Sequence, residues 1–489
     1  MLYYNVRYFG ILSLNYFARR EKMQLTSLQF LIFLPIVALM NYIIPKKFRY
    51  IWLLIASVCF YASLDLKGIP VLLFTILSTY LAGLLIDKKE GNIKKVILFA
   101  AIAANILILA LSKYSGLTIF AVVGISFFMF MAISYCIDVY RGKISSEKNI
   151  LQYALFVSFF PNVTSGPIER AGNMLPQFKE PKDFDYDRVV DGLLQMLWGY
   201  FMKLVIADRA GVLVNAIFSD PKAYAGTATF VAASLYGFEI YCDFGGYSNI
   251  AIGCARVLGY DLMKNFNSPF LAGSIAGYWR NWHISLSSWF KDYLYIPLGG
   301  NRKGTLRKYL NIIIVFIVSG LWHGAGITFA IWGLLHGLYQ VIGYILMPVR
   351  DKLCSIFKVN REGFSHKLLK IAITFSLLNV GWIFFRVTNF KDAVYMAVHL
   401  FELHPGVLFD GTFYQLGLNR PNVILLVIAI MILIAADIAG LMKINIREKI
   451  MSQGLWLRWL IYITAIVVIV TCGIWGPGYN ETGFIYVQF

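Results

Sequence analysis

Ionisable side chains within apolar stretches are the residues of this sequence best placed to do chemistry, because a charge in such surroundings is costly to keep. A histidine there can accept and release a proton, and a carboxylate or a lysine can orient it. Each such residue is therefore a functional candidate. Those lying in or beside apolar or amphipathic segments are Lys203, Glu239, Asp243, His283, His323, His336 and Asp437.

His323 stands in the segment 318–329 (VSGLWHGAGITF), among three glycines. Glycine lets a helix loosen and lets another group approach the backbone closely. A low dielectric favours the neutral imidazole, which is the form able to take a proton from a hydroxyl nucleophile. The residues alone support two interpretations equally, a general base and a histidine hydrogen-bonded between helices.

Other kinds of site receive less support from the sequence. His283, His323 and His336 are conceivable metal ligands, but they are widely separated and lack HxxxH or carboxylate ligand spacing, so we expect no metal. No G-x-S-x-G motif supplies a serine nucleophile. Asp243 lies in the glycine-interrupted segment 241–250 (YCDFGGYSNI), where we expect it to orient a helix break.

The composition indicates that most side chains face lipid. Of 489 residues, 59% are hydrophobic and 14% are charged, with mean hydropathy +0.66, whereas about a quarter of a soluble domain is charged. The long apolar runs do not alternate in polarity as membrane β-strands do, which predicts an all-α polytopic membrane protein. The net charge of +18 is spread over many loops, which is typical of the positive-inside bias and not of nucleic-acid binding.

Roughly eleven or twelve membrane crossings are predicted, because 310–347 is long enough for two. The alternation of basic loops puts the loop at 45–49 inside, and therefore the chain before the first span outside. Arg19, Arg20 and Lys22 conflict with this, so residues 1–22 are interpreted as a leader or a wrongly assigned extension, and 23–489 as one membrane-embedded domain. The predicted spans are 28–45, 49–65, 69–87, 96–112, 117–139, 189–207, 224–241, 310–347, 368–386, 421–442 and 456–476.

Three segments do not fit plain spans. Proline and glycine interrupt 159–169 (FFPNVTSGPIE), which predicts a re-entrant or surface loop. Aromatic residues recur at helical spacing over 270–300, which suits either a helix at the membrane interface or one packed against neighbouring spans. Four basic residues over 301–308 indicate a loop on the cytoplasmic side of the membrane. The alternative is a phosphate-binding rim for a nucleotide-bearing donor.

Two long motifs, 278–304 (YWRNWHISLSSWFKDYLYIPLGGNRKG) and 320–337 (GLWHGAGITFAIWGLLHG), resemble the membrane-bound O-acyltransferase (MBOAT) family. The resemblance is to the bacterial branch that O-acetylates exported polysaccharides such as alginate and peptidoglycan. It extends over nearly the whole chain from about Met23. Further matches are FPNVTSGPIER at 160–170, YCDFGGYSNI at 241–250, the pair Phe385 and Arg386, and the closing FIYVQF at 484–489.

The resemblance implies a multi-helix fold around a central funnel, in the bacterial cytoplasmic membrane. It places the family's essential histidine at His323, as the base, and its second frequent histidine at His283, as an assisting group. It also implies an acetyl group taken from a cytosolic thioester, with acetyl-CoA as donor and no tightly bound cofactor. The implied partners are a polysaccharide acceptor, membrane lipid and an extracytoplasmic acetyltransferase of the serine-hydrolase type.

Within this interpretation, Trp282, Trp322 and Tyr247 are predicted to line the donor channel. Asn281 stands where relatives commonly have arginine, and Asn249 where they have an acid, so the roles of these two positions stay open. The full set of predicted substrate-binding residues is Trp282, Trp322, Asp243, Tyr247, Ser248, Asn281 and Arg280.

Two alternatives remain from the sequence. One is D-alanyl transfer to teichoic acid from a carrier protein. The LGGNRKG extension at 298–304 favours polysaccharide acetylation over this alternative. The other, of a different class, is a lipid or sugar transporter, in which buried ionisable residues would line a pathway.

Overall fold

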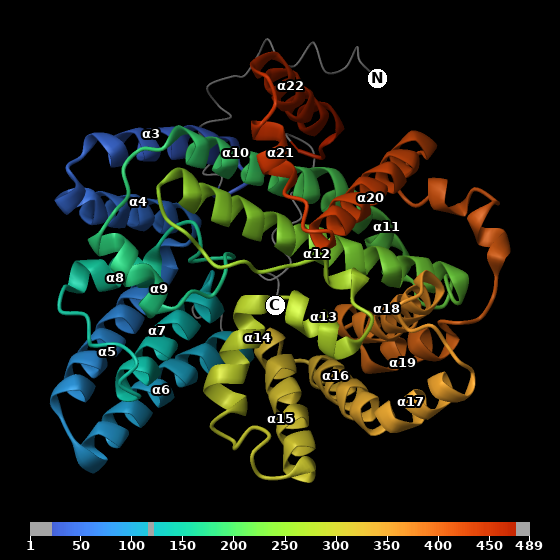
Figure 1. The fold of residues 1–489 in the computed structure, drawn as a ribbon, viewed down its shortest axis with the longest axis horizontal. Coiled ribbons are helices and arrows are strands. Elements are labelled where there is room, and N and C mark those ends of the chain that lie inside the picture. Colours follow the sequence, from blue (N-terminus) through green and yellow to red (C-terminus); the bar gives the residue numbers. More distant parts are fainter. Residues whose placement is uncertain (1–21, 116–121, 476–489) are drawn as a thin grey trace.

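Helices form all the regular structure of the residues that the computed structural model describes, 22–115 and 122–475 (Figure 1). The predicted all-α fold is therefore confirmed. The N-terminal helices are α3 (Leu28–Ile43), α4 (Arg49–Leu64), α5 (Ile69–Lys88), α6 (Gly91–Tyr114), α7 (Ile125–Tyr140), α8 (Ile150–Ser158) and α9 (Ala171–Lys179). The central elements are α10 (Tyr186–Tyr200), the π-helix η4 (Phe201–Ala207), α11 (Asp208–Ser219), α12 (Thr227–Val257), α13 (Ile275–Asn281), α14 (Ile284–Phe290) and the π-helix η6 (Lys291–Tyr295). The C-terminal helices are α15 (Thr305–His323), α16 (Ile327–Ile345), α17 (Met347–Ile356), α18 (Phe364–Arg386), α19 (Phe390–His399), α20 (Arg420–Leu441), α21 (Ile446–Met451) and α22 (Leu455–Cys472).

Eight helices of the described chain are long and apolar enough to cross a membrane, and the protein is a multi-pass membrane protein. Two more apolar helices, α3 and α7, are shorter. The predicted spans 189–207 and 224–241 coincide with α10–η4 and α12, which are not among the eight. The eight are Lys46–Leu64, Leu66–Lys88, Gly91–Tyr114, Thr305–His323, Ile327–Ile345, Phe364–Arg386, Arg420–Leu441 and Leu455–Cys472.

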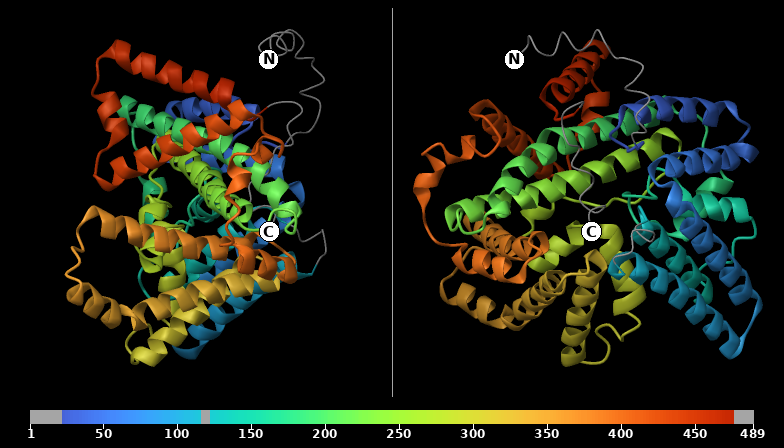
Figure 2. Two further views of the ribbon diagram at one scale, coloured as in Figure 1. Left: turned by 90° about the vertical axis from the view of Figure 1, so that its right-hand side faces the viewer. Right: turned by 180° about the vertical axis from the view of Figure 1, so that it is seen from behind.

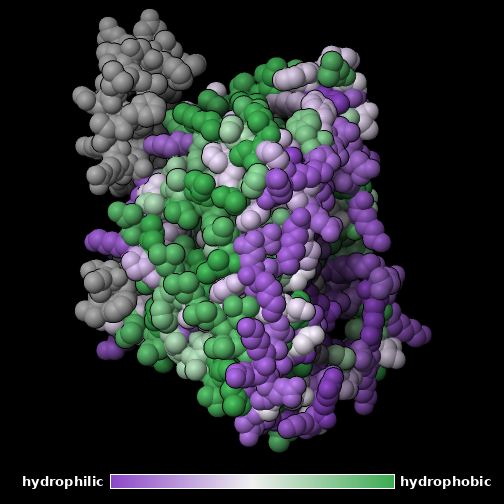
Figure 3. Space-filling view, turned by 90° about the vertical axis from the view of Figure 1, so that its left-hand side faces the viewer, coloured by the Kyte–Doolittle hydropathy of each residue, from purple (hydrophilic) through white to green (hydrophobic). Residues whose placement is uncertain are grey.

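The outer surface of these helices is suited to lipid. On the face shown in Figure 3, hydrophobic side chains cover a broad continuous area on one side, and hydrophilic side chains cover the other side. Several large apolar side chains on the N-terminal helices are more than half exposed, as at Leu39 (64%) on α3 and Phe99 (68%) on α6. Since exposed apolar surface on this scale would be unfavourable in water, this face meets hydrocarbon.

The central helices α10 and α12 cross the molecule side by side, above α13 to α16, as seen from the front (Figure 1) and from behind (Figure 2). They pack very closely because glycines face each other. A β-carbon at Gly199 would lie 2.6 Å from the carbonyl oxygen of Gly246, and small residues commonly allow such an approach in membranes. The predicted break at 241–250 is therefore wrong, since α12 continues through this segment and its glycines serve helix packing.

The irregular segment 159–169 is buried between α8 and α9, so it is not a surface loop. The segment 270–300 forms the short helices α13 and α14 and the π-helix η6. Trp279, Trp282 and Trp289 there are all at least nine-tenths buried. The aromatic side chains therefore pack inside the protein, against the neighbouring helices.

The long apolar run 310–347 divides into α15 and α16, as its length predicted, and the turn between them holds Gly324 and Gly326. A β-carbon at Gly320 would clash with the carbonyl oxygen of Phe329, and one at Gly333 with that of Phe316. The glycine near His323 thus serves close helix packing, and α15 remains helical up to His323 itself. The tight α15–α16 hairpin fixes the position of His323.

Candidate active site

Asn265, in the connection between α12 and α13, is the polar centre of the site. Its side chain is fully buried, with an exposure of 0%. Asn265 Nδ2 donates to Ser248 Oγ at 3.0 Å, and Asn265 Oδ1 accepts from Ser285 N at 3.2 Å and from Ser285 Oγ at 2.9 Å. The same Oδ1 lies 3.2 Å from His283 Nδ1. One buried amide therefore joins α12 to the start of α14.

These contacts determine which nitrogen of His283 carries the proton. The backbone N–H of Ser285 can only donate, so the Asn265 atom that it contacts must be the oxygen. His283 Nδ1 must then donate to that oxygen. A neutral imidazole has a single N–H, so its Nε2 carries the lone pair. His283 is thus held in the tautomer whose Nε2 can accept a proton.

The backbone of His283 is also constrained. It has φ 43° and ψ 55°, the left-handed conformation that non-glycine residues rarely adopt. Such a residue is strained by about 1–3 kcal/mol and persists only where its surroundings enforce it, often at functional sites. The ring packs edge-on against Phe244 at a centroid distance of 4.6 Å. Backbone, ring and Nδ1 are therefore all fixed.

His323 is the last residue of α15, and its exposure is 3%. Its ring centroid lies 4.7 Å from that of Trp322, 5.1 Å from Trp332 and 5.2 Å from Phe385. The Trp322 ring also lies 6.2 Å from the His283 ring. The structure therefore brings the two predicted histidines to the same indole, with His283 and His323 both beside Trp322, in a buried aromatic environment.

Asp243 and Tyr247 belong to a neighbouring polar cluster between η4 and α12. Lys203 Nζ lies 2.6 Å from Asp243 Oδ1 and 2.7 Å from Asp208 Oδ1. The Tyr247 ring centroid is 5.7 Å from the same Nζ, and its hydroxyl donates to Gln24 Oε1 at 3.1 Å. Lys203 belongs to the π-helix η4 and is buried. Asp243 thus neutralises a buried lysine and does not orient a helix break.

The other predicted substrate-binding residues differ in their surroundings. Ser248 contacts Asn265, as described above. Trp282 is 2% exposed and lies in an aromatic cluster, stacked on Tyr278 at 5.3 Å. Asn281 ends α13, and its backbone oxygen accepts from Asn267 N at 2.9 Å. Arg280 is exposed at the surface. The structure therefore groups Ser248 with His283, through Asn265, and leaves Arg280 at the surface.

His336 has a packing role in the described structure. Its Nδ1 accepts a hydrogen bond from Trp279 Nε1 at 3.1 Å, and its ring lies 5.0 Å from Trp332. This contact ties α16 to α13, which carries the chain toward His283. Among the residues of 22–115 and 122–475, no three His, Cys, Asp or Glu side chains gather as metal ligands would.

Asn265 lines a cavity of about 270 Å³. Its lining includes the site residues Ser248 and Asn265 together with three basic side chains, Arg256, Lys264 and Arg447. Asp191 pairs with two of these, Arg256 at 2.9 Å and Arg447 at 3.1 Å. Asp437 lies close enough to Lys264 to act on its charge. Two acids for three bases leave a net positive charge at the cavity, a property that favours an anionic ligand.

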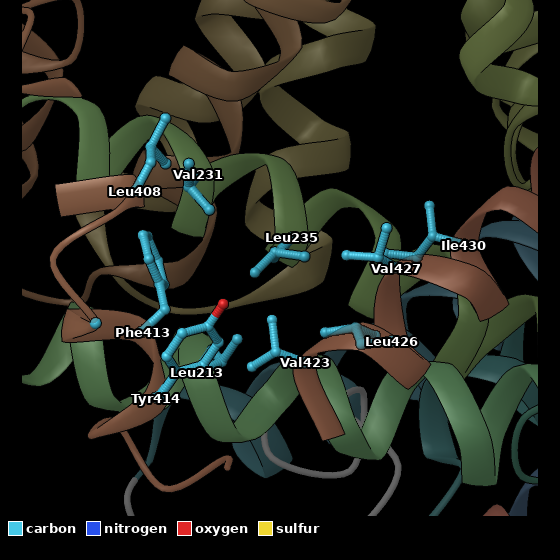
Figure 4. Close-up of a pocket in the computed structure, with 11 residues that line it drawn as sticks. Leu213, Val231, Leu235, Leu408, Phe413, Tyr414, Val423, Leu426, Val427 and Ile430 are labelled. Atoms are coloured by element: carbon cyan, nitrogen blue, oxygen red, sulfur yellow. The ribbon is translucent and has the colours of Figure 1, made fainter. Parts of the chain in front are cut away.

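A second cavity, of about 230 Å³, is apolar and lies elsewhere. Figure 4 shows aliphatic and aromatic side chains around it, with the Tyr414 hydroxyl as a polar group. No predicted site residue lines it. Its lining residues are Leu213, Val231, Leu235, Leu408, Gly411, Phe413, Tyr414, Val423, Leu426, Val427 and Ile430.

Comparison with known proteins identifies the family. The model of the membrane-bound O-acyltransferase family matches residues 55–376, which is more than half of the chain. The chain belongs to this family. The match includes α13 to α16, and hence both His283 and His323. The protein is accordingly an O-acyltransferase, and the resemblance predicted from its two long motifs is confirmed.

Three relatives illustrate the range of similarity. A probable alginate O-acetylase of Pseudomonas fluorescens is 34% identical, over 83% of this chain and 80% of the relative. A peptidoglycan O-acetyltransferase of Helicobacter pylori is 35% identical, over 74% and 75% respectively. A teichoic acid D-alanyltransferase of Bacillus subtilis is 26% identical, over 74% and 97%. The first two are the more similar, in keeping with the acetylating branch that the motifs resemble.

Asn265 is a site residue that the sequence did not indicate. It lies in a polar connection, KNFNSP at 264–269, where asparagine is common. Its burial and its contact with His283 arise only when the connection folds onto α14. The closing FIYVQF motif, which also supports the resemblance, lies outside the described residues.

Proposed function

We propose that this protein transfers an acetyl group from cytosolic acetyl-CoA toward hydroxyl groups of an exported cell-envelope polysaccharide, with His323 as the general base. The observation that carries the proposal is the pairing of His323 and His283 beside Trp322 in a buried site. Both relatives at 34% and 35% identity are named for O-acetylation of a polysaccharide. Acetyl transfer to such an acceptor is the activity that this similarity favours.

In the proposed reaction, His323 takes the proton of the acceptor hydroxyl, or of a partner's hydroxyl nucleophile, as that oxygen attacks the thioester carbonyl carbon. A C–O bond forms, and the carbonyl oxygen becomes an oxyanion. The C–S bond then breaks, the ester carbonyl reforms, and the leaving thiolate receives the proton from the histidine. His283, with its Nε2 lone pair, assists by hydrogen bonding to the reacting groups.

The basic cavity at Arg256, Lys264 and Arg447 supports entry of a phosphate-bearing donor. It adjoins Asn265, the residue bonded to His283. The charge bias predicts the loop 45–49, which follows α3, on the cytosolic side. Asn41, near the end of α3, donates to the backbone oxygen of Leu258 at 3.1 Å, two residues beyond the cavity residue Arg256. The cavity therefore lies near this loop. A donor such as acetyl-CoA would therefore enter from the cytosol with its phosphates held by the basic side chains.

The acceptor would approach from the opposite face. α15 begins after the basic loop 301–304 and ends at His323, and its 19 residues span roughly 28 Å at about 1.5 Å each. His323 is thus nearly a membrane thickness away from the basic loop. An extracytoplasmic acetyltransferase of the serine-hydrolase type is the partner that we propose to receive the group there.

A second candidate is D-alanyl transfer to teichoic acid, because a D-alanyltransferase of Bacillus subtilis matches 74% of this chain. Its lower identity, 26% against 34% and 35%, favours acetylation. Labelled acetate appearing in the envelope polymer would support acetyl transfer, and labelled D-alanine would support the alternative.

The experiment that tests the proposal is acetyl-CoA turnover by the purified protein in lipid, for wild type against His323→Ala. Removing the base should abolish turnover while the variant stays at wild-type level in the membrane. A fully active, folded His323→Ala variant would refute the assignment of the base. Movement of an unmodified solute into liposomes, with no turnover of acetyl-CoA, would instead identify a transporter.

A further inference from the structure

Lys113, near the end of α6, is a basic residue that the proposed mechanism does not use. Most of the surface of α6 is not buried in the protein, but the Lys113 side chain turns inward. Lys113 Nζ donates to the backbone oxygen of Trp322 and lies 5.3 Å from the centre of the Trp322 ring. Trp322 directly precedes His323, so the end of α6 brings an ammonium group to the candidate active site.

The charge of Lys113 is not neutralised by a carboxylate in the described part of the chain. No ion pair there includes Lys113, whereas the buried Lys203 contacts two carboxylates. The ammonium group contacts the residue that directly precedes His323, so its charge lies beside the site. An anion that forms next to such a cation, away from water, is stabilised far more than it would be in water.

Acyl transfer creates an anion of this kind. When a nucleophile adds to the thioester, the carbonyl oxygen takes the negative charge. We propose that Lys113 is a catalytic residue that donates a hydrogen bond to this oxyanion, an inference that rests on the proposed function. The ammonium group has three N–H donors, and Trp322 uses one of them. Lys113 keeps all its protons throughout, and its charge lowers the energy of the intermediate.

A purely structural role makes a different prediction. The last carbonyl groups of a helix lack helical partners, and side chains can satisfy them. Tyr114 does this beside Lys113, since its hydroxyl donates to the backbone oxygen of Leu321 at 2.7 Å. If Lys113 served only to hold α6 against the end of α15, Tyr114 would share that task, and any donor at position 113 would suffice. A positive charge at the end of α15 adds only a little to the stability of such docking, so a large loss of kcat in folded protein when the charge is removed is expected only for the catalytic role.

Four variants separate the two roles in the acetyl-CoA turnover assay with purified protein in lipid. Lys113→Gln keeps an N–H donor but removes the charge, Lys113→Met removes both, Lys113→Arg keeps the charge, and Tyr114→Phe removes the neighbouring contact. We expect Lys113→Gln and Lys113→Met to lower kcat by about 100-fold, with KM nearly unchanged, as for removal of an oxyanion donor. Lys113→Arg should retain much of the activity, and Tyr114→Phe nearly all of it.

Thermal midpoints of the same samples show whether each variant is folded, and Lys113→Gln decides the matter if Lys113→Met does not fold. A folded Lys113→Gln variant with kcat near wild type overturns the proposal. Equal losses of kcat in Lys113→Gln and Tyr114→Phe also overturn it, in favour of helix docking. If wild type itself turns over no acetyl-CoA, the proposed function fails and this inference with it, so the two failures are distinguishable.

Discussion

Replacement of Asn265 by leucine tests the organisation of the site most directly. Leucine is similar in size but offers no hydrogen bond. The change leaves three buried donors without their acceptor, Ser285 N, Ser285 Oγ and His283 Nδ1. Each buried donor left unpaired costs about 1–3 kcal/mol, so we expect a loss of about 3–5 kcal/mol in the free energy of unfolding, allowing for partial relaxation.

Asn265→Leu should lower kcat by more than its loss of folded protein explains. Without the Asn265 oxygen, His283 can change its tautomer and rotate, so that Nε2 no longer presents its lone pair reliably. Removal of a residue that orients a metal-binding histidine typically lowers activity by about 10- to 100-fold, and we take the same range for a histidine that acts without a metal. We expect a fall of this size in kcat for the folded fraction of Asn265→Leu.

Asn105→Leu provides the matched control. Asn105 is also 0% exposed, and its Nδ2 donates to the Ala101 oxygen at 2.9 Å and to Ser78 Oγ at 3.2 Å, bonds that stay within α5 and α6. The Asn105→Leu variant should have a lower thermal midpoint than wild type but the same kcat per folded molecule. The measurement is acetyl-CoA turnover normalised to folded protein after size-exclusion chromatography. If both variants have the same kcat, Asn265 does not organise the site, and the reasoning on the tautomer is wrong.

Two further predictions concern the helix packing around the site. Gly333→Ala should destabilise the protein by about 1–3 kcal/mol, because the new methyl group meets the backbone of α15. Gly343→Ala on the same helix meets nothing within 4 Å and should leave the thermal midpoint unchanged or slightly raised, and equal midpoints for the two would contradict the close packing of α15 and α16. Lys203→Met leaves the buried carboxylates of Asp243 and Asp208 without their cation, so we expect a loss of about 3–5 kcal/mol. Far less folded protein should then be recovered from membranes, and wild-type yield and thermal midpoint in Lys203→Met would show that the cluster does not stabilise the fold.

The sequence by itself determined the class of the protein and most of its helices. Long apolar runs have to be helical in hydrocarbon, because only internal hydrogen bonds satisfy the backbone there. Most of the predicted spans coincide with one helix, whereas 310–347 divides into α15 and α16, and 117–139 contains α7 but begins outside the described residues. Two long motifs in the correct order were sufficient for the family, which the match to residues 55–376 confirms. His323 and His283 were also prominent from sequence, as ionisable residues among apolar and aromatic ones.

Tertiary structure alone decided how these residues work together. The glycines of 241–250 looked like a helix break, but they pack α12 against α10, and a sequence does not show which surface a glycine faces. Asn265 and Lys113 are ordinary polar residues of a connection and a helix end until the fold carries them to His283 and Trp322. Hydrophobic patterns report how each segment meets lipid, whereas a hydrogen bond between distant segments depends on positions that only packing sets.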